Sequence, residues 1–266
     1  MALSRVLCVL GSTLPLALLS ACGPVAKIRP GAESVLAVFA PPTPEEALKM
    51  ATDEFDANKR FEGLSYIAGA TYASEPQYLQ LFQDRLQDRD PGVRSLAARA
   101  LGSYGSTTDA LVIADLMTKD TDVNVRIAAA RALQRLHNPD VIPQLFTALD
   151  ATKESEPRVR VEAASALGQY RETRVVERLI AAMADENLPV NLRVRDSLRT
   201  LTGADFGTSQ ADWQAWYRSS DAPLASAAGY TYPHFSRGQR WFEYIPFIPQ
   251  PPNEPTGIPA GLSPAR

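Results

Sequence analysis

Three arginines recur along the middle of the chain at nearly constant spacing, each close behind acidic side chains. Arg94, Arg126 and Arg160 are separated by 32 and 34 residues. An arginine in the first turn of a helix opposes the helix macrodipole at a cost of about 0.3–1 kcal/mol, so each should pair with a carboxylate. The spacing predicts a ladder of ion pairs along one edge, with a groove for a charged ligand as the alternative. Its expected members are Arg94, Arg126, Arg160, Asp90, Asp122 and Glu156, with Asp88, Asp120 and Glu154 in the same turns.

The same carboxylates are the first candidates for acid–base chemistry, because paired carboxylates hydrolyse glycosides. They are expected in turns that face water, where nothing shifts their pKa. His137 precedes Asn138 and Pro139, a position typical of a helix end. The only cysteines are Cys8 and Cys22, so ligands for a Cys/His metal cluster are missing. We therefore expect no catalytic residue, no metal or other cofactor, and no enzymatic activity.

The N-terminus has the pattern of a signal peptide that ends at a cysteine. Arg5 supplies positive charge, and the apolar run from Val6 to Leu19 is too short to span a hydrocarbon layer of about 30 Å. The sequence Leu19-Ser20-Ala21-Cys22 resembles the lipobox of bacterial lipoproteins. This resemblance implies cleavage after residue 21 and acylation of Cys22; an ordinary secretory peptide is the alternative. Residues 1–21 are thus predicted as signal peptide and residues 22–43 as a tether. The alternative for the tether is that its apolar residues Val35, Leu36, Val38 and Phe39 dock on the first repeat.

Self-comparison shows that the arginines belong to an internal repeat, which must position them. The repeated segments are residues 93–102, 125–133 and 159–168, and a degraded copy ends at Leu201, with Val194 in place of the arginine. Each copy should begin with an amphipathic helix, around residues 78–86, 111–116, 142–149 and 175–183. Acidic, proline-containing turns then start a second helix. Antiparallel helix pairs therefore follow one another along the chain.

Small residues on the predicted second helices, such as Ala97, Ala98 and Ala100, are interpreted as spacing residues that let helices approach closely. The pattern of proline, valine-arginine and alanine-alanine-leucine resembles HEAT repeats, in the short form also seen in phycobilin lyases. Tetratricopeptide and ankyrin repeats have other signature residues. The resemblance implies an all-α fold, an α-solenoid of about five helix pairs over residues 44–203, with a bulky capping pair at its start.

The C-terminal part is rich in aromatic residues and proline. Residues 204–220 are predicted as a capping helix, and the last 46 residues contain nine prolines, which exclude long helices. The aromatic cluster between residues 230 and 247 should dock on the solenoid or on a partner, and residues 249–266 should form free extended chain. The candidate binding aromatics are Trp213, Trp216, Tyr217, Trp241, Phe242 and Tyr244.

The net charge of −3 gives no general attraction to nucleic acid. Together these features predict a lipid-anchored protein of the bacterial cell envelope, facing the periplasm. The resemblance to bacterial lipoproteins and their sorting rules implies the outer membrane rather than the inner one, because Gly23 is not acidic. The expected function is a scaffold that binds another envelope protein or polymer through the solenoid. The alternative is an envelope enzyme acting on a cell-wall or pigment substrate.

Overall fold

A computed structural model describes residues 41–233, 240–244 and 256–263 of the chain. The chain divides into two compact units, residues 1–41 and 42–266, and every element below belongs to the second. The predicted signal peptide, Cys22 and most of the tether lie outside the described residues. Among the helices of the described part, none combines the length and the apolar character needed to cross a membrane.

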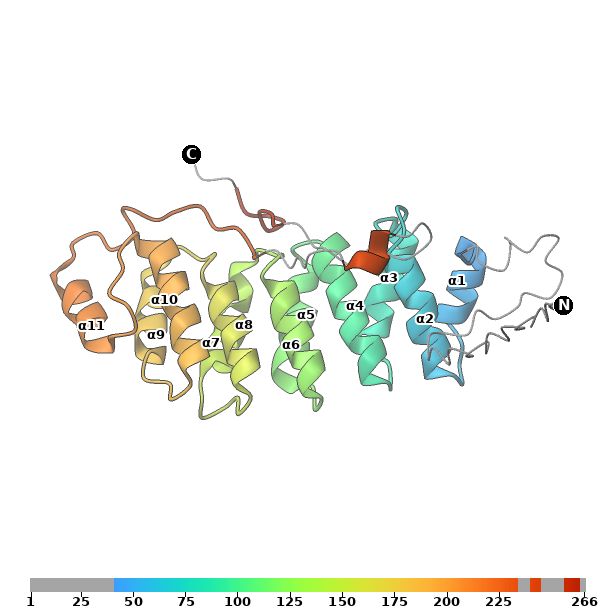
Figure 1. The fold of residues 1–266 in the computed structure, drawn as a ribbon, viewed down its shortest axis with the longest axis horizontal. Helices are drawn as coiled ribbons and strands as arrows, with labels where there is room; N and C mark the ends of the chain where they lie inside the picture. The colour runs from blue at the N-terminus through green and yellow to red at the C-terminus, as the bar shows by residue number, and fades with distance from the viewer. Residues whose placement is uncertain (1–40, 234–239, 245–255, 264–266) are drawn as a thin grey trace, which may run out of the picture. The chain divides into compact units, whose positions relative to one another are not determined.

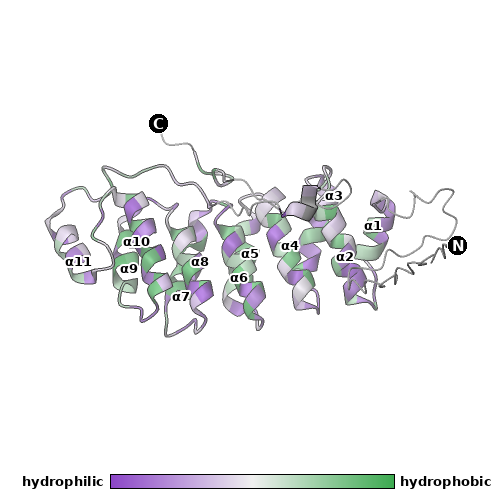
Figure 2. Cartoon of the chain, in the orientation of Figure 1, coloured by the Kyte–Doolittle hydropathy of each residue, from purple (hydrophilic) through white to green (hydrophobic). Residues whose placement is uncertain are grey.

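The second unit is a row of antiparallel helix pairs in chain order (Figure 1). This arrangement confirms the predicted all-α solenoid of five pairs with an added C-terminal helix. Each helix carries both hydrophobic and hydrophilic stripes (Figure 2), as expected for helices with one buried face. The pairs are α1 Pro44–Ala51 with α2 Ala57–Ala68, α3 Pro76–Arg85 with α4 Pro91–Tyr104, α5 Asp109–Lys119 with α6 Val123–Leu133, α7 Ile142–Leu149 with α8 Pro157–Leu167, and α9 Thr173–Ala182 with α10 Leu188–Thr202; α11 Gln210–Ser219 follows. Short 3-10 helices are η2 Pro139–Val141 and η3 Trp241–Tyr244.

The second helices form a continuous packed layer. Helix α2 packs on α4, α4 on α6, α6 on α8, and α8 on α10. The repeated alanines are fully or almost fully buried between them. Helices α4 and α6 approach so closely that a Cβ added at Gly102 would lie 2.8 Å from the Cβ of Ala132. Small side chains at these positions therefore set the distance between repeats.

Acidic residues cap the second helices α2, α4, α6 and α8 at their first residues. Asp90 accepts a hydrogen bond from the backbone N–H of Val93, and Asp122 accepts from the N–H groups of Asn124 and Val125. Asp56 and Glu156 cap α2 and α8 in the same way. An N-cap of this kind stabilises a helix by about 0.5–2 kcal/mol. The acidic turns of the repeat thus fix the start of each arginine-bearing helix.

Helix α11 closes the C-terminal end of the row by packing on α9. Ser209 caps α11 by accepting from the N–H of Asp212. Trp213 is fully buried, and its indole Nε1–H donates to the Gly207 carbonyl over 2.9 Å. The Tyr217 hydroxyl donates to the Glu177 carboxylate of α9. The aromatic face of α11 is therefore packed inward as an end cap.

Two described tail segments, residues 224–233 and 256–263, lie against the solenoid, and we call them the strap. The N–H of Ala228 donates to the Thr200 carbonyl over 2.8 Å, and that of Tyr232 donates to the Gly257 carbonyl over 3.0 Å. Leu136 and Ala260 form a parallel bridge. The expectation of free chain from residue 249 onward is therefore wrong for residues 256–263, because backbone hydrogen bonds hold them on the inter-repeat loop after α6.

Candidate functional site

The most regular feature of the second unit is a ladder of arginine–carboxylate pairs between successive repeats. Arg94 on α4 donates from Nε to Asp120 Oδ2 over 2.7 Å and from Nη2 to Asp120 Oδ1 over 2.8 Å. Its third nitrogen, Nη1, donates to the Asp88 carbonyl over 2.8 Å. One guanidinium thus joins the turn before its own helix to the corresponding turn of the next repeat.

This contact recurs with nearly identical geometry in three further pairs, which all use the planar fork that suits arginine to carboxylates. In the four pairs the arginine side chains are 8–15% exposed and the carboxylate side chains 3–9%. The ladder is therefore largely removed from solvent. The further pairs are Arg60 with Asp88 (2.8 Å), Arg126 with Glu154 (2.8 Å) and Arg160 with Asp185 (2.7 Å).

Each ladder carboxylate also accepts the backbone N–H found two residues later, as Asp88 does from Asp90. Burial alone would raise the pKa of Asp88 and Asp120. The hydrogen bonds from Arg60 and Arg94 and from the backbone outweigh burial, so the pKa of both carboxyls lies below the ordinary value. These groups are held in the charged form, which suits ion pairing and not proton transfer near neutral pH.

The acidic members of the ladder differ from those expected. Asp90, Asp122 and Glu156 were expected opposite the arginines, but their carboxylates cap α4, α6 and α8. The pairing carboxylates lie two residues earlier, at Asp88, Asp120, Glu154 and Asp185. The reason is that an N-cap side chain accepts hydrogen bonds from its own helix. The acidic residue two positions earlier therefore faces the neighbouring repeat.

The ladder begins one repeat earlier than the sequence pattern indicated, and it ends at Arg160 as expected. Arg60 is a member that the repeat comparison missed, and it stands four residues after the Asp56 cap, as Arg94 does after Asp90. In the last repeat the arginine position is Asn191, not Val194, and its Nδ2 donates to the Asp185 carbonyl over 2.9 Å. Both Arg60 and Asn191 stand four residues after the N-cap of their helix, so the N-cap gives the position of each.

The ladder is saturated by its own contacts. Arg160 uses Nε, Nη1 and Nη2 on Asp185 and the Glu154 carbonyl. Such a group cannot bind a charged ligand without giving up a buried pair, which would cost about 3–5 kcal/mol. The geometry therefore favours a structural role in joining repeats over a ligand groove.

His137 lies in the inter-repeat loop that the strap contacts. Its ring stacks on Tyr170 with centroids 4.9 Å apart, and Nδ1 lies 3.3 Å from Gln169 Oε1. Burial lowers the pKa of the imidazole. The Tyr170 hydroxyl donates to the Asn138 carbonyl. Burial raises the pKa of this hydroxyl. The contacts of His137 with Tyr170 and Gln169 account for its position in the loop.

The structure separates the six candidate aromatics into two groups. Trp213, Trp216 and Tyr217 belong to the packed end cap, together with Phe206, whose ring meets Trp213 edge-on at 5.0 Å. Trp241 and Tyr244 on η3 are 81% and 71% exposed. The side chain of Phe242 lies outside the described part. Trp241 and Tyr244 therefore present most of their surface to solvent, whereas Trp213 is buried and Trp216 and Tyr217 are partly buried.

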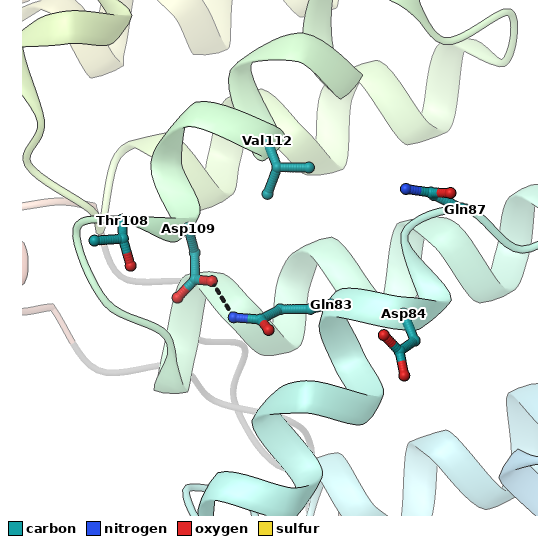
Figure 3. A pocket seen from close by; sticks show the side chains of 6 residues that line it. All are labelled: Gln83, Asp84, Gln87, Thr108, Asp109 and Val112. Carbon is teal, nitrogen blue, oxygen red and sulfur yellow. Dashed lines mark hydrogen bonds between the residues drawn. The ribbon is translucent and has the colours of Figure 1, made fainter.

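Hollows lie between successive first helices of the solenoid. One, of about 510 Å³, lies between α3 and α5, and Figure 3 shows Gln83 donating to Asp109 across it over 2.6 Å. Another, of about 540 Å³, lies between α7 and α9 and includes Phe146 and Arg178. In the described ranges no three His, Cys, Asp or Glu side chains are grouped to hold a metal ion.

Comparison with known proteins agrees with this geometry. Residues 110–199, or 90 of the 266 residues, match the family described as HEAT repeats. No curated protein matches the chain. The solved complex of CpcE and CpcF of phycocyanin lyase from Nostoc sp. PCC7120 is similar over 58% of this chain and 96% of that one, at 19% identity and a TM-score of 0.44. An engineered protein is similar over 66% of this chain and 88% of its own, at 20% identity and a TM-score of 0.46. Residues 110–199 are thus similar to HEAT repeats.

The first of these structures corrects the expectation that the protein is not an enzyme. That structure is a complex of phycocyanin lyase, at 19% identity to this chain. The repeat fold is therefore no ground for excluding enzymatic activity.

Proposed function

We propose that this protein is a lipid-anchored scaffold of the bacterial cell envelope that binds another envelope protein through its HEAT-like solenoid. The proposed anchor is Cys22, because it ends the segment Leu19 to Cys22 that resembles a lipobox. The solenoid would face the periplasm, and Gly23 favours the outer membrane. The binding role is supported by the repeat architecture, since stacked helix pairs present long surfaces to partners.

The main support for this proposal is that the second helices are packed on one another, whereas the first helices leave surface open to solvent. The second helices are packed on one another, and Arg60, Arg94, Arg126 and Arg160 are used within the ladder. The first helices leave a hollow between α3 and α5, and α5 exposes 45% of Leu111 and 41% of Val112. Neighbouring exposed apolar side chains beside a hollow are typical of a protein-binding surface. We therefore assign partner binding to the face formed by α3 and α5.

The anchor makes a direct prediction for Cys22→Ala. Two acyl chains hold a protein stably at a membrane, so the wild-type chain should partition into detergent, with acyl mass on Cys22 as its first residue. The variant should appear in the aqueous phase without that mass. Phase partition and intact-mass measurement of protein made in a bacterial host test this. Cys8→Ala is the matched control, and it should leave acylation unchanged because residue 8 is removed with the signal peptide. Equal membrane retention of both variants would contradict the anchor.

A further inference from the structure

The loop after α6 binds a segment of the tail through an isolated parallel β-bridge. The N–H of Ala260 donates to the Arg135 carbonyl over 2.7 Å, and the N–H of His137 donates to the Ala260 carbonyl over 2.8 Å. These two bonds form the parallel bridge between Leu136 and Ala260. Pairing of one extended segment with exposed backbone groups is a common mode of peptide recognition. The solenoid thus offers a backbone edge that a separate peptide could use.

The fit at this edge depends on the residue that follows Ala260. Gly261 has φ 84°, a conformation that other residues rarely adopt. A Cβ added there would overlap the Thr107 methyl group and lie 3.1 Å from the His137 carbonyl oxygen. Because the loop touches the tail so closely, it selects glycine at this position. The edge therefore carries sequence specificity as well as backbone pairing.

The attachment of this segment is shallow. Of residues 256–263 only Pro259 is buried, while Ala260 and Gly261 are exposed and Ile258 is 49% exposed. Upstream, Tyr232 lies under the Arg135 guanidinium, 5.0 Å from ring centroid to Cζ, and pairs with Gly257. Segments with few buried apolar contacts open at low free-energy cost. Residues 256–263 of the strap can therefore leave the edge without unfolding the helices.

We propose that Thr107 and Arg135 to His137 form a peptide-binding site for an extended Pro-Ala-Gly segment of a partner protein. In this structure the site is filled by Pro259 to Gly261 of the same chain. The partner's segment would replace the strap and form the same two backbone hydrogen bonds. This inference rests on the proposed function, since it names one site through which the scaffold would hold its partner. The tail then acts as a competing ligand that must be displaced.

The test uses the full chain and a fluorescent synthetic peptide of residues 254–264. Gly261→Val should release the strap by steric overlap, and Ala260→Pro should release it by removing the N–H donor. Each variant should bind the peptide about tenfold or more tightly than wild type, because the apparent affinity falls with the fraction of open sites. The peptide carrying Gly261→Val should lose that binding. Ser263→Val is the matched chain control, and it should behave as wild type because Ser263 is exposed.

Fluorescence polarisation and far-UV circular dichroism of the same samples decide the result. Absence of peptide binding by either released variant would overturn the site. Equal binding by all chains, or by the Gly261→Val peptide, would overturn its specificity and with it the proposal. Loss of helix in both variants would show that the strap belongs to the fold and not to an exchangeable site. The assay needs neither membrane nor partner, so failure of the proposed anchor or scaffold role would leave its outcome unchanged.

Discussion

Arg160→Ala is expected to lower the free energy of unfolding by about 3–5 kcal/mol, the usual cost of removing one partner of a buried ion pair. The side chains of Arg160 and Asp185 are 8% and 4% exposed. The substitution leaves the Asp185 carboxylate without its cation and the Glu154 carbonyl without the Nη1 donor. Urea unfolding followed by far-UV circular dichroism measures the loss.

Arg174→Ala is the matched control for the ladder. Arg174 pairs with Glu172, but its side chain is 55% exposed, and exposed pairs contribute only about 0–1 kcal/mol. The two variants remove the same side chain from sites that differ chiefly in burial. Equal, small losses of stability for both would contradict a structural role of the ladder.

Trp213→Ala should lower the free energy of unfolding by a similar amount, about 3–5 kcal/mol. Trp213 is fully buried in the end cap, where its ring meets Phe206 at 5.0 Å and Trp216 at 5.8 Å. Truncation leaves a cavity between α9 and α11 and removes the hydrogen bond to Gly207. Thermal and urea unfolding report the change.

Tyr244→Ala serves as the control for loss of an aromatic ring, because Tyr244 is 71% exposed. Exposed substitutions usually change stability by no more than about 0.5 kcal/mol. If Trp213→Ala were as mild as this control, α11 would not be the packed end cap of the solenoid.

The fold could be predicted because its determinants are local and repeated. The alanines around Ala97 and Ala129 recur at the spacing of the arginines, and acidic turns precede each second helix. These patterns give helix pairs directly. The last repeat was assigned the wrong register because its N-cap, Asn187, follows Glu156 by 31 residues, whereas the other copies are 32 or 34 apart. Alignment on Leu201 therefore placed Val194 where Asn191 stands.

The contacts of the ladder and the strap were harder to predict, for different reasons. Choosing Asp120 over Asp122 as the partner of Arg94 requires knowing which acid is already used as an N-cap. The bridge between Leu136 and Ala260 joins residues 124 positions apart, and no periodicity links two such segments. Composition predicted docking of the aromatic tail, and within the described residues Tyr232 of that tail lies under the Arg135 guanidinium.

Photo-crosslinking in intact bacterial cells tests most directly the central claim that the solenoid binds an envelope protein through the face of α3 and α5. A photoreactive residue at Val112, which lines the hollow between these helices, should yield one discrete crosslinked envelope protein, identified by mass spectrometry. The same residue at Glu186, exposed in the turn before α10, is the control and should not give that product. No product from Val112, or the same products from both positions, would contradict the claim.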